Sequence, residues 1–158
     1  MINIRFAEPK DIDIIFNFIL ELSIYENLEH AFTKNKEDLN KYLFGNKKFA
    51  EVLIAEYNEV PVGFALFFTN FSTFECKPGI YLEDLFVLEN FRNKGIGKTL
   101  LKELANIVIS RNYGRLEWTV LDWNPARKFY ENIGAKCLND WLIYRLKGEE
   151  LLKFAKEE

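Results

Sequence analysis

Basic residues and glycines gather in one short stretch, Arg92–Lys98, with the sequence RNKGIGK. An apolar run precedes this stretch and apolar residues spaced three and four apart follow it, which predicts a strand, a loop and a helix. A glycine-rich turn that opens a helix presents unpaired backbone N–H groups at the positive end of the helix dipole. Such a turn binds anions, so we expect a phosphate-bearing ligand at this glycine loop.

The spacing within the glycine loop excludes two familiar nucleotide motifs. A Walker A loop would need a glycine at position 92, where the chain has Arg92, so a P-loop nucleotide-binding protein is ruled out. The dinucleotide fingerprint would need its third glycine at position 100, where the chain has Leu100. What remains is Arg-x-x-Gly-x-Gly, from Arg92 to Gly97. The alternative is a plain strand-to-helix turn whose glycines serve the backbone alone.

This remaining pattern resembles the acetyl-CoA pyrophosphate loop of the GNAT acetyltransferases. A second segment, LEWTVLDWNPARKFYENIGA at 116–135, resembles their second coenzyme segment, which has a strand, an Asn, Ala-x-x-Phe-Tyr and Gly-Ala. Both segments are similar to the spermidine/spermine and thialysine acetyltransferase branch. The opening strand with ELSIYE at 21–26 and the tail from Trp141 also fit that branch. The resemblance therefore covers nearly the whole chain.

The resemblance implies a set of coenzyme contacts. The backbone of the strand would pair with the pantetheine arm, the glycine loop would hold the pyrophosphate, and the downstream helix would approach the thioester. The residues concerned are Leu85, Phe86, Val87, Arg92, Asn93, Lys94, Gly95, Ile96, Gly97, Lys98, Asn124, Ala126, Arg127 and Tyr130. In the family the Asn commonly stands three residues before the Ala, whereas Asn124 stands two before Ala126.

Two of these side chains are expected to be catalytic. Acetyl transfer to an amine needs a group that accepts the proton of the ammonium and a group that protonates the leaving thiolate. The resemblance assigns the second role to Tyr130, whose alternative is a core tyrosine on a helix. It assigns the first role, acting through water, to Glu83, whose alternative is a solvated carboxylate at a strand edge.

The resemblance also outlines an amine site made of Tyr25, Glu26, Glu83, Asp84 and Trp141. Carboxylates with an aromatic wall suit an alkyl-ammonium cation. Glu83 and Asp84 are adjacent on a predicted strand, so their side chains should point to opposite faces. For Tyr25 and Glu26 the alternative is an ordinary helix end.

Composition sets the broad class. The chain has 158 residues with 49% hydrophobic content, which predicts one folded domain over residues 1–158. It has no apolar run of membrane-spanning length, and a net charge of −3 gives no attraction for nucleic acid. His30 is the single histidine, and Cys76 and Cys137 lack metal-ligand spacing, so a Ser-His-Asp triad, a zinc site and any other metal site are not expected. We expect a cytoplasmic protein.

Strands alternate with helices along the sequence, which predicts a mixed α/β sheet. The pair Pro78-Gly79 should come before a strand rather than lie within one. We expect strands at 2–7, 52–57, 60–71, 81–87, 116–120, 136–140 and 142–146, and helices at 12–22, 35–43, 95–111 and 125–133, with a short helix or arm at 151–155. The resemblance implies the GNAT fold, a mostly antiparallel central sheet flanked by helices and splayed between its fourth and fifth strands.

The sequence therefore predicts an acetyl-CoA-dependent N-acetyltransferase that acts on a polyamine, a diamine or a thialysine-like amino acid. Transfer would be direct, in a ternary complex, because no cysteine has an evident base partner. The resemblance implies a homodimer whose C-terminal segments are exchanged or packed across the interface. Two alternatives stay open: a protein or peptide amine acetyltransferase, and a non-catalytic acetyl-CoA-binding domain.

Overall fold

The computed structural model describes residues 1–157. The chain divides into two compact units, Met1–Thr119 and the part that begins at Val120. Within the described residues, no helix is both long enough and apolar enough to cross a bilayer.

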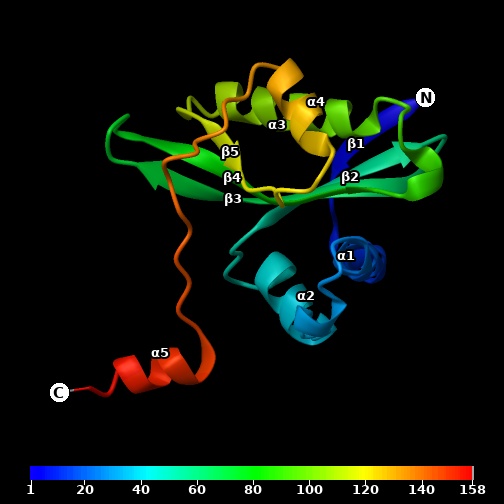
Figure 1. Cartoon of the computed structure of the whole chain (residues 1–158). Coiled ribbons are helices and arrows are strands. Elements are labelled where there is room, and N and C mark those ends of the chain that lie inside the picture. Colours follow the sequence, from blue (N-terminus) through cyan, green and yellow to red (C-terminus); the bar gives the residue numbers. More distant parts are fainter. Residues whose placement is uncertain (158) are drawn as a thin grey trace. The chain divides into compact units, whose positions relative to one another are not determined.

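The first unit is built on a five-stranded sheet in which the strands follow their sequence order (Figure 1). The first four strands pair antiparallel, and the last pair is parallel. A parallel pair needs a long crossover, which the helix between the last two strands supplies. The strands are β1 (Ile2–Phe6), β2 (Glu51–Tyr57), β3 (Val60–Ser72), β4 (Lys77–Val87) and β5 (Leu116–Trp118).

The pairing of β4 with β5 is short. Their ladder runs from Ile80 opposite Leu116 to Leu82 opposite Trp118, and β4 then continues to Val87. In the described part of the chain, no strand pairs with 83–87 on the side of β4 that faces away from β3. This opening confirms the predicted splay and exposes a strand edge whose backbone groups can bind a ligand.

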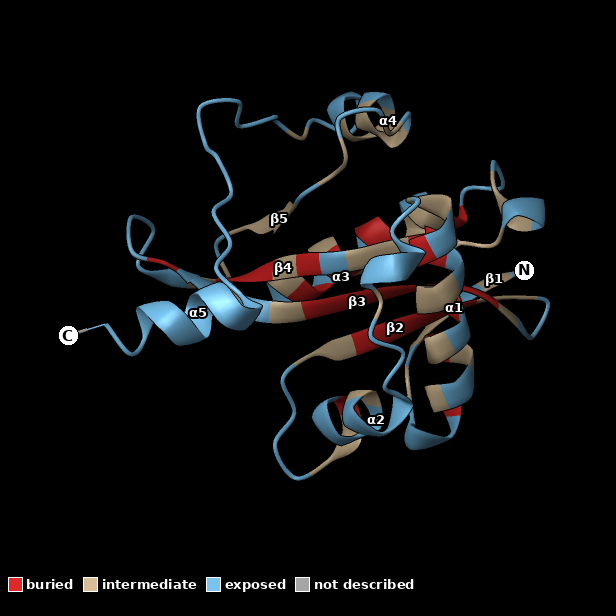
Figure 2. Cartoon of the chain, turned by 60° about the horizontal axis from the view of Figure 1, so that its bottom comes forward, coloured by how far each residue is buried: buried red, intermediate tan, exposed pale blue. Residues whose placement is uncertain are grey.

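Helices cover both faces of the sheet (Figure 1). Helix α3 (Ile96–Ser110) lies on one face, and α1 (Ile12–Tyr25) and α2 (Lys36–Phe44) lie on the other. Figure 2 shows the buried residues along β2, β3 and β4. The hydrophobic cluster beneath α1 and α2 consists of Ile15, Phe18, Leu22, Leu43, Val52, Ile54, Phe64, Leu66 and Phe86.

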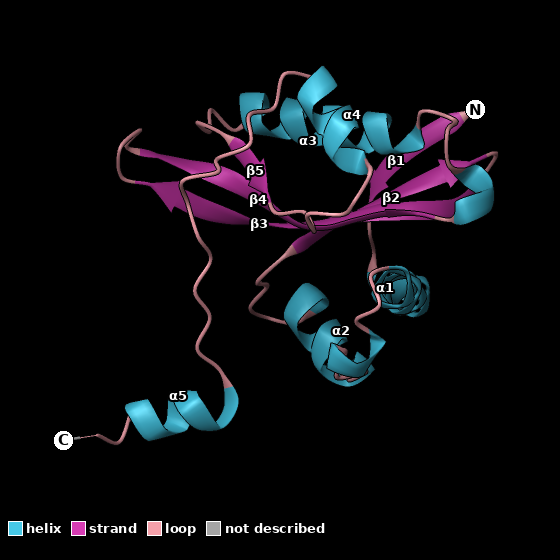
Figure 3. Ribbon diagram, in the orientation of Figure 1, coloured by secondary structure: helices cyan, strands magenta, loops and turns pink. Residues whose placement is uncertain are grey.

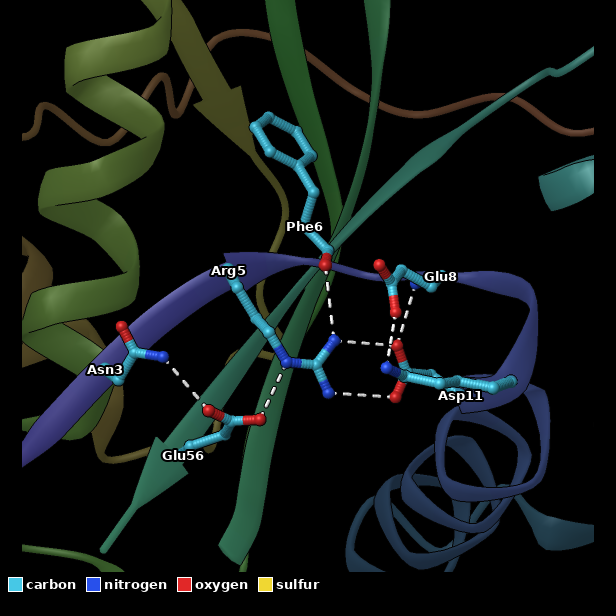
Figure 4. Close-up of polar contacts among 7 residues, drawn as sticks. Asn3, Arg5, Phe6, Glu8, Asp11 and Glu56 are labelled. Atoms are coloured by element: carbon cyan, nitrogen blue, oxygen red, sulfur yellow. Dashed lines mark hydrogen bonds and ion pairs between the residues drawn. The ribbon is translucent and has the colours of Figure 1, made fainter. Parts of the chain in front are cut away.

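A polar clamp fixes the start of α1 to β1 (Figure 4). The guanidinium of Arg5 donates to both carboxylate oxygens of Asp11, at 2.7 and 2.9 Å, and its Nε donates to Glu56 at 2.7 Å. Asp11 also accepts the backbone N–H of Glu8. The hydrogen bond from Arg5 lowers the pKa of the buried Asp11 carboxyl. The helix that carries Tyr25 and Glu26 at its far end is therefore anchored at its first turn.

The predicted boundary at Pro78-Gly79 is wrong, because β4 begins at Lys77 and contains both residues. Pro78 lacks an N–H group, and it is tolerated here near the start of the strand, where its carbonyl accepts the N–H of Gly114. A Cβ on Gly79 would lie 2.8 Å from the side-chain oxygen of Asn70. The glycine therefore permits close packing inside the strand and does not end it.

The second unit contains α4 (Ala126–Asn132) and α5 (Gly148–Phe154). The strands predicted at 136–140 and 142–146 are absent from the described structure, where this stretch is irregular (Figure 3). β5 also ends at Trp118 and does not reach Val120. Strand-like side chains are not enough to make a strand, because a strand forms only where a partner supplies backbone hydrogen bonds.

Candidate functional site

The glycine loop leads directly into α3. Gly95 caps the helix with φ of +82°, in the left-handed region that favours glycine. The first intrahelical bond runs from the N–H of Thr99 to the carbonyl of Gly95. The N–H groups of Ile96, Gly97 and Lys98 come before that bond, at the positive end of the helix dipole. The buried side chain of Ile96 anchors the loop, so this donor set is held in place.

The basic side chains of the glycine loop differ in their surroundings. Lys98 is exposed, as is Asn93. The ammonium of Lys94 lies 5.2 Å from the ring centre of Tyr57 and 5.1 Å from that of Phe91. Arg92 is partly buried and folds back onto the strand that precedes it. The loop therefore presents backbone N–H groups together with an exposed lysine.

A β-bulge places the two adjacent acids of β4. Asp84 pairs with Leu66 and Leu82 pairs with Phe67, so Glu83 has no residue opposite it on β3. Glu83 is exposed and Asp84 is half-buried. The prediction that Glu83 and Asp84 point to opposite faces of the sheet depends on regular alternation of side chains along the strand, and the bulge interrupts that alternation.

Asp84 is the most perturbed acid in this region. Burial, and then the charges of Glu83 and Glu26, raise the pKa of Asp84 to about 7 from its ordinary 3.8. Burial also raises the pKa of Glu26. Among residues 1–157, neither lysine nor arginine forms an ion pair with any of these three carboxyls. Glu26, Glu83 and Asp84 thus form an acidic cluster without a cation.

The end of α1 supplies one side of this acidic cluster. α1 ends at Tyr25, Glu26 is its C-cap, and Asn27 turns the chain with φ of +58°. Tyr25 and Glu26 are both half-buried. The fold therefore brings Glu26 close to Asp84, although about sixty positions separate the two in the sequence.

The end of β4 supplies the open strand edge beside the cluster. Leu85, Phe86 and Val87 pair with Ala65, Phe64 and Gly63 on β3, and no strand covers their other side in the described residues. The side chain of Phe86 is 5% exposed and belongs to the hydrophobic core. Its backbone is thereby fixed, which suits a strand that must present N–H and C=O groups to a ligand.

In the second unit, Asn124 accepts hydrogen bonds from the first residues of α4. Its side-chain oxygen accepts the N–H of Ala126 at 2.9 Å, and its carbonyl accepts the N–H of Arg127. This contact explains the spacing of two residues between Asn124 and Ala126, because a side chain at that distance can reach the first free N–H of the helix. The guanidinium of Arg127 donates to the carbonyl of Asp122.

Tyr130 and Trp141 also belong to the second unit. Tyr130 is half-buried on α4, and its ring centre lies 5.6 Å from that of Phe129. Trp141 is 73% exposed and lies in the irregular stretch before α5. Their assignment to the thiol and the amine stays a prediction.

Two features of the site could not be predicted from the sequence. Asp84, rather than Glu83, carries the strongly raised pKa, which is caused by burial and by the charges of Glu83 and Glu26, and neither the burial nor the proximity of Glu26 can be read from the sequence. Arg92 packs on Tyr25, whose ring centre lies 4.6 Å from the guanidinium carbon. The adjacent acids of YLED were the only sequence signal for the first feature, and no signal existed for the second.

Comparison with known proteins gives a consistent result. Residues 21–135 match the family described as "Acetyltransferase (GNAT) family". An L-ornithine N5-acetyltransferase of Arabidopsis thaliana is 31% identical, over 94% of this chain and 85% of its own. A thialysine N-epsilon-acetyltransferase of Mus musculus is 32% identical, over 96% of each chain. A spermidine/spermine N(1)-acetyltransferase-like protein of Homo sapiens is 34% identical over 98% of this chain, which spans 24% of that longer protein.

Solved structures agree with these relatives. An integron cassette protein from the mobile metagenome of V. cholerae superposes with a TM-score of 0.82 and 33% identity, covering 99% of this chain and 98% of its own. An aminoglycoside acetyltransferase from a soil metagenome, solved with sisomicin, has a TM-score of 0.76 at 20% identity, covering 92% of this chain and 97% of its own. The second likeness concerns the fold alone.

Proposed function

The chain belongs to the GNAT acetyltransferase family and is an N-acetyltransferase, and on this premise we propose that it acetylates a small cationic amine. The acetyl donor is acetyl-CoA, and the acceptor is a diamine, a polyamine or a thialysine-like or ornithine-like amino acid. The observation that carries this proposal is the acidic cluster of Glu26, Glu83 and Asp84, which no lysine or arginine among residues 1–157 neutralises.

The acidic cluster suits a compact cation for an electrostatic reason. Burial and the charges of Glu83 and Glu26 raise the pKa of Asp84, and a positive charge that enters among these carboxyls would stabilise its ionised form. The cation would favour ionisation of Asp84, whose pKa of about 7 shows how costly its charge is without one. The ring of Tyr25, which immediately precedes Glu26 at the end of α1, would give the alkyl part of the amine an apolar surface.

The names of the relatives support the same class of substrate. Ornithine, thialysine and spermidine or spermine, which occur in the names of relatives 31–34% identical to this chain, each carry a primary amine on a short alkyl chain. We propose that this chain shares the preference for an amine of that kind.

The acids of β4 supply the proton acceptor that the reaction needs. An ammonium of pKa about 10.4 must lose a proton before its nitrogen attacks the thioester carbonyl. We assign this proton to Asp84 or Glu83, directly or through water. The nitrogen then attacks the carbonyl and the C–S bond breaks. Tyr130 donates a proton to the thiolate that leaves, and the second proton lost by the nitrogen restores Tyr130, so the products are the N-acetylated amine and free coenzyme A.

The coenzyme is held mainly by backbone groups in this proposal. The free N–H groups at the start of α3 bind the pyrophosphate, and exposed Lys98 adds positive charge. The open edge of β4 at 85–87 pairs with the pantetheine arm, and one of its N–H groups faces the thioester oxygen.

The test is release of free thiol from acetyl-CoA with a panel of spermidine, spermine, ornithine, thialysine, short diamines and a lysine peptide. We expect turnover on a small amine, and we expect Glu83→Gln and Asp84→Asn each to raise the KM of the amine at least tenfold more than that of acetyl-CoA. Tyr130→Phe should lower kcat about 100-fold while acetyl-CoA still binds.

The controls separate the possible outcomes. Glu89→Gln removes an exposed acid beside the glycine loop but outside the acidic cluster, so it should leave the KM of the amine unchanged. Acetylation of the peptide with no turnover of any small amine would contradict the proposed substrate class. Binding of acetyl-CoA with no turnover of either would contradict an active enzyme.

A further inference from the structure

The guanidinium of Arg92 contacts a backbone carbonyl and two aromatic rings, and binding a phosphate does not require such contacts. Its Nε donates to the carbonyl of Val87 at 3.0 Å. Its guanidinium carbon lies 4.6 Å from the ring centre of Tyr25 and 5.6 Å from that of Phe86. The guanidinium therefore packs against aromatic rings of two different elements, α1 and β4.

These contacts fix the orientation of the guanidinium. A planar guanidinium packs on aromatic rings in a way that the point charge of a lysine does not reproduce. Phe86 is rigid because it is 5% exposed and its ring centre lies 6.3 Å from that of Phe18 in the core. Arg92 thus links Tyr25 to the fixed end of β4.

Arg92 and Tyr25 belong to the proposed sites of two different ligands, the coenzyme and the amine. Arg92 is the first residue of the glycine loop, which is the proposed pyrophosphate site. Tyr25 is the last residue of α1 and immediately precedes Glu26, whose charge helps to raise the pKa of Asp84. A displacement of Arg92 would therefore shift both the first residue of the glycine loop and the aromatic wall of the amine site.

We propose that Arg92 is a positioning residue that couples coenzyme binding at the glycine loop to the amine wall at the end of α1. The amine part of this inference rests on the proposed function, whereas the coenzyme part requires only that acetyl-CoA binds. If Arg92 were a phosphate ligand with no role at the amine site, Arg92→Lys would raise the KM of acetyl-CoA and leave the KM of the amine unchanged.

The test is the dissociation constant of acetyl-CoA, measured by calorimetry for wild type, Tyr25→Leu, Tyr25→Phe, Arg92→Lys and the double variant Tyr25→Leu/Arg92→Lys. We expect Tyr25→Leu to weaken binding about three- to tenfold, the size of a lost cation–π contact. Tyr25→Phe keeps the ring face and should bind as wild type does. In the Arg92→Lys background, Tyr25→Leu should have no further effect, because the contact is already lost.

Steady-state kinetics provide a second measurement. Arg92→Lys should raise the KM of the amine as well as that of acetyl-CoA. Lys94→Met is the matched control, because this cation of the same loop has its described contacts with the rings of Tyr57 and Phe91 and not with α1. It should raise the KM of acetyl-CoA alone.

Wild-type acetyl-CoA affinity in Tyr25→Leu, or fully additive effects in the double variant, would overturn the coupling. If Tyr25→Leu does not fold, Tyr25→Met makes the same comparison. If the wild type acetylates no amine, the proposed function fails, while calorimetry still decides whether Tyr25 and Arg92 are coupled.

Discussion

Asp84 shows how a single residue acquires its chemistry from its neighbours. An aspartate in water is ionised at neutral pH, but burial and the charges of Glu83 and Glu26 raise the pKa of Asp84 to about 7. A carboxyl with this pKa exchanges protons readily at neutral pH, which suits it to accept the proton of an ammonium. The same perturbation also costs stability, because the folded protein must hold an unfavourable charge.

This cost predicts how Asp84→Asn changes stability with pH. In the unfolded chain Asp84 loses its proton near pH 3.8, but in the folded protein it does so only near pH 7. Between these values the folded state binds more protons, so the contribution of Asp84 to stability falls as pH rises through this window. Urea unfolding should show Asp84→Asn gaining about 1–3 kcal/mol over wild type between pH 4 and pH 8.

Glu59→Gln, which alters an exposed turn residue of β2–β3, is the control and should show no such pH-dependent gain. An equal difference between Asp84→Asn and wild type at pH 4 and pH 8 would contradict the raised pKa of Asp84.

At the scale of elements, the site depends on where regular structure stops. β4 continues past the end of its ladder with β5, and Glu26 at the end of α1 lies close to Asp84 on β4. α3 begins at a glycine with a positive φ, which leaves its first N–H groups available. At the end of each element, backbone or side-chain groups are exposed that would be hydrogen-bonded or buried in the interior of the same element.

Gly95 and Gly97 allow this arrangement to be tested as a pair. Gly95 has a φ of +82°, whereas Gly97 does not have a positive φ, and an added Cβ would meet no atom within 4 Å at either position. Gly95→Ala should therefore lower the free energy of unfolding by about 1 kcal/mol. Gly97→Ala should leave the stability unchanged or slightly higher, because alanine favours a helix.

Both substitutions should weaken acetyl-CoA binding, and calorimetry beside thermal unfolding will measure this. Gly95→Ala disturbs the loop backbone, while the methyl of Gly97→Ala enters the space assigned to the pyrophosphate. Unaltered acetyl-CoA affinity in Gly97→Ala would place the pyrophosphate elsewhere.

At the scale of the whole molecule, the second unit carries large apolar side chains that are exposed to solvent. Between α4 and α5 the exposed large hydrophobic residues are Ile133, Leu138, Trp141, Leu142, Ile143, Tyr144 and Leu146. A run of this kind in a folded protein usually marks an interaction surface. We propose that a second copy of the chain covers it, which would make the enzyme a homodimer.

Substitution of one of these residues tests the dimer. Ile143 is 69% exposed in this run, and Ile109 is 76% exposed on α3 of the first unit. Light scattering after size exclusion should give a dimer for wild type and for Ile109→Glu, but a lower mass for Ile143→Glu, because a buried charge disrupts an apolar interface. A wild-type monomer, or a dimer that persists in Ile143→Glu, would contradict the proposal.

The sequence by itself determined the family, the sheet with its flanking helices, and the glycine loop. These three features depend on patterns that are local in the chain, namely the strand–loop–helix pattern around Gly95 and Gly97 and the sequence motif around Phe129 and Tyr130. It failed at Pro78-Gly79, where close packing against Asn70 overrides the usual turn preference, and at 136–146, where no described strand is paired.

Only the tertiary structure decided how the acids and Arg92 are used. Glu26 and Asp84 are distant in the chain, and the pKa of Asp84 depends on desolvation and on charges that folding brings together. The bulge at Glu83 and the packing of Arg92 on Tyr25 likewise arise from contacts between elements. The sequence shows which groups are present and how they are spaced. Their chemistry is set by burial and proximity, which exist only once the chain has folded.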